Sequence, residues 1–281
     1  DSSRAGFAEA IEAAKQADIV IISVGEARDM TGEAKSRSNI SLPGVQEELI
    51  RAVQAVGKPV VVLISAGRPL VFNWTADHVD AILYTWWLGT EAGNSISDVL
   101  FGDYNPSAKL PITFPRTVGQ VPIYYNHYNT GRPPRSETNT NYVSAYIDLL
   151  NSPKFPFGYG LSYTSFSYSP VQLSADSIRG NAKLTASVTL TNTGKLAGTE
   201  TVQLYIRDVT GSVVRPVKEL KGFKKLTLQP GESAIVDFTI VTDMLKFYNK
   251  DLKYDWEPGE FIIMIGGNSN DVKSARVKWM K

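Results

Sequence analysis

The chain has 281 residues, of which 43% are hydrophobic and 20% are charged, and its 29 basic residues nearly balance its 28 acidic ones. This balance gives no support to a nucleic-acid or membrane-surface partner, and no apolar run approaches the roughly 18 residues of a membrane-spanning helix. Cysteine is absent, which excludes disulfides and thiol nucleophiles, and the two histidines, His78 and His127, lie too far apart to favour a metal site. We therefore expect neither a metal nor a cofactor.

The first residue is Asp rather than Met, and no signal-peptide pattern is present. We expect the chain to begin inside a longer protein, or to be a processed or engineered product. A chain without disulfides fits the cytoplasm and a bacterial periplasm equally well.

The first hundred residues alternate between helical and extended patterns. Apolar residues at helical spacing predict helices over 7–17, 45–56 and 91–101. Nearly continuous apolar runs, rich in β-branched residues, predict buried strands over 19–24, 60–65 and 79–87. This alternation predicts an α/β sandwich with a mainly parallel sheet.

The pattern changes after Gly102. Residues 106–156 are rich in Pro, Asn, Tyr, Thr and Ser, and they predict a long ordered connector. Beyond about residue 167, alternating apolar and polar residues predict strands over 183–191, 200–207, 219–228, 234–240 and 261–265. These short strands predict a β-sandwich of the fibronectin type III kind. We expect an α/β domain over 1–135, the connector over 136–166 and the β-sandwich over 167–281.

A polar loop of about twenty residues follows the strand predicted at 19–24, and loops of that length are usually functional or disordered. It ends at Leu42-Pro43-Gly44, where the second helix begins. Its place at the carboxyl end of a strand is where open α/β sheets bind ligands. It carries three carboxylates, Glu26, Asp29 and Glu33, which favour acid/base chemistry on a substrate such as a sugar. Each could equally be a solvated loop acid, and Arg37 could orient a sugar hydroxyl or be a surface charge.

Other motifs favour structural roles. Residues 89–94, GTEAGN, resemble a phosphate-binding turn but lack its spacing, so the glycines indicate a tight strand-to-helix connection. Trp86 and Trp87 indicate packing, and the aromatic segment 155–161 indicates a clasp between domains. Neither histidine lies near a nucleophile-elbow motif, so no Ser/His/Asp triad is supported.

Long runs of the sequence resemble glycoside hydrolase family 3, of the periplasmic β-glucosidase type. The runs are GEAKSRSNISLPGVQEELI, GKPVVVLISAGRPL, ILYTWWLGTEAGNSISDVLFGDYNPSAKLPITFPRTVGQVPIYYNHYNTGRP and FPFGYGLSYTSF. TNTGKLAGTETVQLYIRD and RPVKELKGFKKLTLQPGES are similar to the family's C-terminal fibronectin III-like domain. The resemblance covers essentially the whole chain.

The resemblance implies a retaining exo-β-glycosidase, a β-glucosidase that hydrolyses terminal β-D-glucosyl residues. In this family an N-terminal barrel supplies an Asp nucleophile, and a loop of the form Gly-Glu-Ala-x-Ser-Arg supplies the general acid/base. That motif falls on Gly32–Arg37, which implies that Glu33 is the acid/base. Asp29 and Arg37 are candidates for substrate binding. A branch of the family that uses a His-Asp dyad from the barrel is disfavoured, because the loop carrying the Glu is present here.

The sequence holds no barrel, so we expect no nucleophile in this chain. Retaining hydrolysis needs two carboxyl groups about 5–5.5 Å apart, and we therefore expect the chain by itself to be inactive. The missing barrel would be its partner, with a β-glucoside or oligosaccharide as substrate. By resemblance the location would be the periplasm of a bacterium or the outside of the cell.

Two other classes of protein stay open. The chain could be a non-catalytic carbohydrate-binding or structural module, although its aromatic residues do not form an obvious sugar platform. It could also be a nucleotide- or flavin-binding α/β protein, which the missing phosphate motif disfavours. Glucose and xylose are both possible sugars, and the linkage preference and oligomeric state are open.

Overall fold

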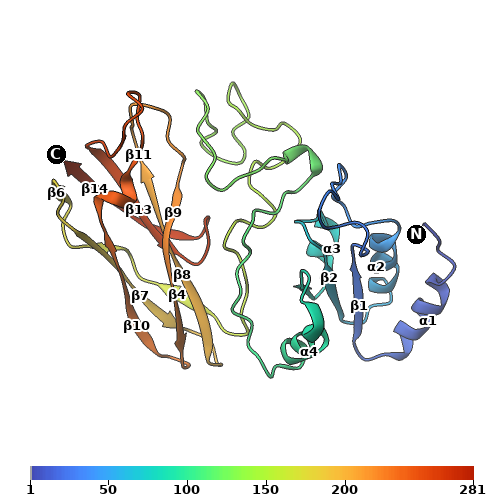
Figure 1. Ribbon diagram of the computed structural model, residues 1–281. Helices are drawn as coiled ribbons and strands as arrows, with labels where there is room; N and C mark the ends of the chain where they lie inside the picture. Colours follow the sequence, from blue (N-terminus) through green and yellow to red (C-terminus); the bar gives the residue numbers. More distant parts are fainter. Residues whose placement is uncertain (1) are drawn as a thin grey trace. The chain divides into compact units, whose positions relative to one another are not determined.

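The computed structural model describes residues 2–281. Residue contacts divide the chain into two compact units (Figure 1). The α/β unit comprises the chain up to Asp103 together with Phe114–Pro122, and the β-sandwich unit comprises Tyr104–Thr113 together with Ile123–Lys281. The fold class predicted from the sequence, α/β followed by all-β, is confirmed, whereas the domain limits 1–135, 136–166 and 167–281 stay a prediction.

The α/β unit contains a three-stranded parallel sheet in the order β1-β2-β3. Its strands are β1 (Val20–Gly25), β2 (Val60–Ser65) and β3 (Ala81–Tyr84). The six consecutive apolar or small residues of β2 form the central strand of the sheet, which is hydrogen-bonded to β1 on one edge and to β3 on the other. Parallel order places the carboxyl ends of all three strands at one edge, where the long loop leaves β1.

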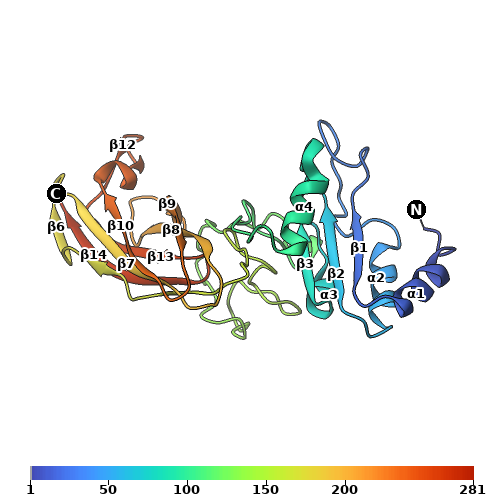
Figure 2. The same cartoon turned by 90° about the horizontal axis from the view of Figure 1, so that it is seen from below.

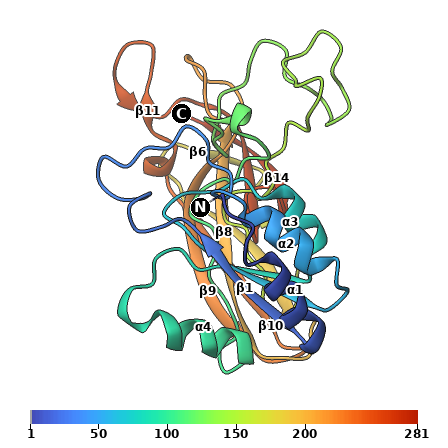
Figure 3. The ribbon, with the colours of Figure 1, turned by 90° about the vertical axis from the view of Figure 1, so that its right-hand side faces the viewer.

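Four α-helices and two short 3₁₀ helices accompany this sheet. The α-helices are α1 (Phe7–Gln16), α2 (Gln46–Gln54), α3 (Asn73–His78) and α4 (Ala92–Phe101). The 3₁₀ helices are η1 (Gly89–Glu91) and η2 (Val118–Gln120). Figure 3 shows α1, α2 and α3 on one side of the sheet and α4 on the other. The core between the sheet and α2 consists of buried aliphatic side chains: Ile22, Val24, Ile50, Val53, Val62 and Ile64.

The second unit is a β-sandwich of two main sheets (Figure 2). One sheet has the order β10-β7-β4, with β5 also paired to β7, and the other has the order β6-β14-β13-β8-β9. The strands are β4 (Phe166–Tyr168), β5 (Gln172–Leu173), β6 (Ser177–Arg179), β7 (Leu184–Asn192), β8 (Gly198–Asp208), β9 (Glu219–Leu228), β10 (Ser233–Ile240), β13 (Gly259–Gly266) and β14 (Val272–Met280). A short hairpin pairs β11 (Phe247–Tyr248) with β12 (Tyr254–Asp255), after the 3₁₀ helix η3 (Thr242–Leu245).

The alternation of side chains along these strands closes one hydrophobic core between the two sheets. Along β7 every second residue is buried, from Leu184 to Asn192. Trp279 of β14 is fully buried in this core, and its indole nitrogen donates a hydrogen bond to the Gly180 carbonyl at 2.9 Å. The pattern is that of a sheet with one face packed on the core and the other face in water.

A buried ionic contact holds residues 104–113 and 158–160 against β8 within the β-sandwich unit. Leu110 exchanges backbone hydrogen bonds with this second segment, donating to Tyr159 and accepting from Gly158. Lys109 Nζ donates to the carbonyl of Gly160 at 3.0 Å and to the Glu200 carboxylate at 3.1 Å. These contacts fix both segments on the sandwich.

No helix among residues 2–281 has the length and the apolar character needed to cross a bilayer.

Candidate active site

The long loop begins at Gly25, where β1 runs close against β2. Gly25 has a φ of +134°, and a Cβ added there would lie 1.9 Å from the Ser65 carbonyl oxygen, so only glycine fits. The side chain of Gln46, at the start of α2, bonds the Gly25 N–H at 2.7 Å and its carbonyl at 2.9 Å. The end of β1 is therefore held from two sides before the chain leaves the sheet.

The loop itself contains two hydrogen-bonded turns in succession. In the first, the Met30 N–H donates to the Ala27 carbonyl at 3.0 Å, and in the second the Lys35 N–H donates to the Gly32 carbonyl at 3.2 Å. Asp29 and Glu33 occupy inner positions of these turns. Ala34, which follows Glu33, has a φ of +57°, a conformation that costs energy for a residue with a Cβ.

Glu33 and Asp29 are both exposed to solvent. Within residues 2–281, neither carboxylate makes a hydrogen bond or an ion pair. The structure thus presents the two predicted acids on consecutive turns of one loop, with their oxygen atoms available to another molecule.

Glu26 differs from these two acids because it is buried, with only 6% of its surface exposed. Its Oε1 accepts a hydrogen bond from Arg37 Nη1 at 2.7 Å and lies 2.9 Å from Arg68 Nε, and its Oε2 accepts from the Gly67 N–H at 3.2 Å. Burial is the largest single influence and acts to raise the pKa of Glu26. The hydrogen bonds from Arg37 and Gly67, together with the ion pair with Arg68, outweigh it and lower the pKa below the ordinary value for Glu. Glu26 is therefore a charged anchor beneath the loop.

Arg37, one of the two residues predicted to bind substrate, is also one of the two cationic partners of this anchor. Besides Glu26 it bonds the Ser41 carbonyl through Nη2 at 3.2 Å, and 20% of its side chain is exposed. The far end of the loop is fixed to the segment after β2, since the Val71 N–H donates to the Ile40 carbonyl at 2.8 Å. Both ends of the loop are therefore attached to the sheet.

Arg68 was missed by the sequence reasoning. Its Nη2 donates to the carbonyls of Met30 at 2.7 Å and Lys35 at 2.8 Å. The only available sequence signal was the position of Gly67-Arg68 directly after the strand that was predicted next to 19–24. Neighbouring parallel strands end at the same edge, so residues following each of them meet there.

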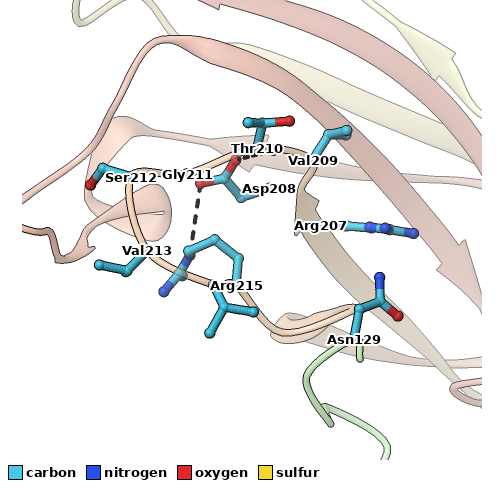
Figure 4. A pocket seen from close by; sticks show the side chains of 10 residues that line it. Asn129, Arg207, Asp208, Val209, Thr210, Gly211, Ser212, Val213 and Arg215 are labelled. Carbon is cyan, nitrogen blue, oxygen red and sulfur yellow. Dashed lines mark hydrogen bonds and ion pairs between the residues drawn. The ribbon is translucent and has the colours of Figure 1, made fainter. Parts of the chain in front are cut away.

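A separate cavity of ≈ 320 Å³ lies in the β-sandwich unit, at the end of β8. Figure 4 shows Asp208 there, pointing toward Arg215 and the backbone of Thr210. Asp208 accepts a hydrogen bond from the Thr210 N–H at 3.2 Å, while Arg215 also bonds Glu219 at 2.9 Å. These charged groups of the cavity wall stabilise their own turn, and we assign the cavity no ligand.

The acidic and imidazole groups of residues 2–281 form no cluster of three or more that could hold a metal ion.

Residues 2–163 match the glycosyl hydrolase family 3 C-terminal domain, and residues 200–269 match the fibronectin type III-like domain. The chain belongs to glycosyl hydrolase family 3, as the resemblance in the sequence implied. The first match contains the whole loop with Glu26, Asp29, Glu33 and Arg37, and the second lies within the β-sandwich.

Curated relatives include the periplasmic beta-glucosidase of Salmonella typhimurium, which is 54% identical over 277 residues, or 99% of this chain and 36% of that protein. A beta-xylosidase of Formosa agariphila is 44% identical over 97% of this chain and 37% of that protein. The chain thus spans little more than a third of the length of these relatives.

Among solved structures, the beta-glucosidase of Listeria innocua in complex with glucose superposes with a TM-score of 0.95 at 40% identity. The match covers 100% of this chain and 39% of that one. A mutant of the Listeria enzyme in complex with laminaribiose superposes with a TM-score of 0.94 at 41% identity. The order of an α/β unit and a β-sandwich is therefore shared with enzymes of this family.

Proposed function

We propose that this chain is part of a retaining exo-β-glycosidase, a β-glucosidase that releases terminal β-D-glucosyl residues, and that Glu33 is its general acid/base. The observation that carries the proposal is the setting of Glu33. It lies at the exposed corner of a turn, without a partner among residues 2–281, on a loop whose two ends are attached to the sheet. The names of the Salmonella and Listeria relatives support a β-glucoside as the substrate.

The reaction requires two carboxyl groups with different tasks. Glu33 in its acid form would donate a proton to the glycosidic oxygen while a nucleophilic carboxylate attacks the anomeric carbon. In the second step the Glu33 carboxylate would take a proton from water, and the resulting hydroxide equivalent would release the sugar from the nucleophile. The Glu33 carboxyl group therefore gives a proton in the first step and takes one in the second.

The nucleophile is proposed to come from a barrel domain outside these 281 residues. Glu26 is a poor candidate because its oxygens are engaged with Arg37, Arg68 and the Gly67 N–H. We accordingly propose that the chain by itself has no glycosidase activity and that the barrel domain is its partner in catalysis.

Asp29 and Arg37 are proposed to contact the sugar. Asp29 is exposed on the turn preceding that of Glu33 and can accept hydrogen bonds from hydroxyl groups. Arg37 uses Nη1 and Nη2 on Glu26 and Ser41, and its guanidinium retains further N–H donors. The domain limits 1–135, 136–166 and 167–281 and a periplasmic or secreted location belong to the same proposal, the latter supported by the name of the Salmonella relative.

The test joins this chain to the part of the Salmonella enzyme that it does not match. The 281-residue chain, the Salmonella part and the fusion would each be assayed on aryl β-glucosides and on glucose disaccharides. We expect activity on disaccharides only from the fusion. Activity of the chain by itself would overturn the proposal and would make Asp29 a candidate nucleophile. A folded fusion without activity would also contradict the proposal.

Glu33→Ala in the fusion tests the role of the residue. General acid catalysis contributes about 10²-fold or more, so kcat/KM should fall by that factor for substrates with poor leaving groups. Activated aryl glucosides, which need no proton, should keep most of their kcat/KM, and azide should restore their turnover. Glu9→Ala, an exposed acid in α1, is the matched control and should leave both substrates unaffected. An unchanged profile in Glu33→Ala would move the role elsewhere.

A further inference from the structure

We propose that Arg68 is a positioning residue that sets the place of Glu33, an inference that rests on the proposed function. Arg68 lies outside the loop, three residues beyond the end of β2. Its Nη2 group nonetheless donates hydrogen bonds to loop carbonyls on both sides of Glu33, at Met30 (2.7 Å) and at Lys35 (2.8 Å). One nitrogen atom therefore joins the end of the turn that carries Glu33 to the end of the turn before it.

The guanidinium of Arg68 is itself held from below. Its Nε lies 2.9 Å from Glu26 Oε1, and Glu26 has no exposed side-chain surface, while 17% of the Arg68 side chain is exposed. The Arg68 carbonyl accepts a hydrogen bond from the hydroxyl of Tyr84, at the end of β3. The same hydroxyl accepts from the Leu70 N–H at 3.3 Å. All three strands thus contribute to the place of this side chain, because Glu26 follows β1, Arg68 follows β2 and Tyr84 ends β3.

The other arginine of the cluster has a different reach. Arg37 bonds Glu26 and the Ser41 carbonyl, and both of these contacts lie away from the turn that carries Glu33. Arg68 contacts Lys35, the last residue of that turn, and Met30, the last residue of the turn before it. The two residues share an anchor, but the positions of Met30 and Lys35 depend on Arg68.

Gly67 allows the loop to rest directly on the chain after β2. A Cβ added at Gly67 would lie 2.0 Å from Thr31 Oγ1 and 3.1 Å from Thr31 Cβ. Thr31 is two residues from Glu33. The short segment Gly67-Arg68 therefore sets how closely the loop packs on the chain after β2, and it also fixes the distance between the two turns of the loop.

The chemistry requires the planar fork of arginine at this position. In Arg68, Nη2 donates hydrogen bonds to two carbonyls, while Nε faces the Glu26 carboxylate as an ion pair at 2.9 Å without a hydrogen bond, and both nitrogens belong to one rigid group. Lysine offers a single ammonium at the end of a flexible stem and cannot reproduce this spacing. A shift of the turn would misplace the Glu33 carboxyl relative to the glycosidic oxygen, and proton transfer depends steeply on that distance.

The experiment measures kcat/KM of the fusion protein for a series of aryl β-glucosides that differ only in leaving-group pKa. We expect Arg68→Lys and Arg68→Met to lower kcat/KM for poor leaving groups by about 10-fold to 100-fold, while activated substrates change by less than about 3-fold. In the Arg68 variants, kcat/KM should fall more steeply with rising leaving-group pKa than in the wild type, as it should in Glu33→Ala. Arg4→Lys is the matched control, because Arg4 makes a two-point contact with Glu48 at the surface of the same unit and should leave the series unchanged.

The outcomes separate this inference from the function on which it rests. A flat profile in Glu33→Ala would refute the proposed function. A steep profile in Glu33→Ala with an unchanged profile in the Arg68 variants would refute only the role of Arg68. An equal loss for all leaving groups would make Arg68 a purely structural residue and overturn the inference as well.

A second readout needs no catalysis and uses the 281-residue chain. Lys35 is exposed, and trypsin cleavage after it can be followed by mass spectrometry. Loss of the Arg68 bonds to Met30 and Lys35 should speed this cleavage in Arg68→Met and leave it unchanged in Arg4→Lys. An unchanged rate in Arg68→Met would show that the loop is held by other contacts and would overturn the proposal.

Discussion

The α/β unit and the β-sandwich unit each bury one glutamate, and the two are bonded in different ways. Glu26, below the loop, faces the guanidinium groups of Arg37 and Arg68 and the Gly67 N–H. Glu200, on β8, faces Lys109 at 3.1 Å and the Tyr168 hydroxyl at 3.0 Å. Their relative exposures are almost equal, at 6% and 4%.

The pKa values of these two carboxyl groups move in opposite directions. Burial raises the pKa of Glu200, and the charge and hydrogen bond of Lys109 offset this effect only in part. For Glu26 the donors outweigh burial and the pKa falls. The balance between burial and the number and charge of the donors therefore decides which form of the acid the fold favours. The unit with the candidate active site has the more strongly charged anchor.

The largest difference is expected from replacing each glutamate by its amide. Glu26→Gln should lower the free energy of unfolding by about 3 kcal/mol, the lower end of the cost of breaking a buried ion pair. Its two oxygens both accept from N–H donors, so an amide nitrogen at either position meets a donor. Glu200→Gln should cost less, about 1 kcal/mol, because burial disfavours the charged form of Glu200 and the amide oxygen can still accept from Tyr168.

Urea unfolding of the full chain at pH 7 measures both variants, with fluorescence and circular dichroism followed together. Equal costs for the two substitutions would contradict the comparison. A changed slope of the transition, rather than a changed midpoint, would show that the variant had altered the unfolded or folded state instead.

The difference between the two carboxylates could not be read from the sequence. Glu26 stands among Asp29 and Glu33 in one polar loop, and its burial depends on Arg68, 42 positions later. The strand at 60–65 was predicted with its observed limits because six consecutive residues fit the middle of a sheet. Strand β14 was missed, because exposed residues such as Lys273, Arg276 and Lys278 interrupt its apolar pattern.

The candidate site shows the same limit. The motif Gly32–Arg37 could be recognised from local sequence, and the place of Glu33 after β1 followed from the order of elements. Its supports come from residues after β2 and β3 that have no local signal, because a single Gly-Arg pair is compatible with any loop. Long-range polar contacts of this kind are specified by the tertiary fold and not by periodicity.

Acid titration should distinguish Glu26 from Glu200, because their contributions to folding stability change with pH in opposite directions. The folded-state pKa of Glu26 is lowered, so its contribution to stability is complete above the ordinary Glu value of about 4.3 and is lost as the pH falls below it. The folded-state pKa of Glu200 is raised, so the folded state binds this proton more tightly than the unfolded state does. The contribution of this group to stability therefore falls as the pH rises above about 4.3.

Urea midpoints measured from pH 3.5 to pH 7 for the wild type and both amide variants check these signs. The difference between wild type and Glu26→Gln should shrink toward the acid end of the series. At the acid end, the urea midpoint of the wild type should rise relative to that of Glu200→Gln. Curves for both variants that run parallel to the wild-type curve would show that neither group titrates differently in the folded and unfolded states.

The smallest expected difference comes from the tyrosines that complete the two clusters. The Tyr168 hydroxyl donates to the Glu200 carboxylate, whereas the Tyr84 hydroxyl donates to the neutral Arg68 carbonyl. A hydrogen bond to a charged group contributes more than one to a neutral group, so Tyr168→Phe should cost about 2 kcal/mol and Tyr84→Phe about 1 kcal/mol in unfolding free energy. Both substitutions keep the ring, and urea midpoints at pH 7 compare them directly. The difference between the two costs in unfolding free energy should become smaller at low pH, where protonated Glu200 is a neutral acceptor. A larger cost for Tyr84→Phe at pH 7 would mean that the backbone of Arg68 carries more of the stability of the α/β unit than its hydrogen bonds indicate.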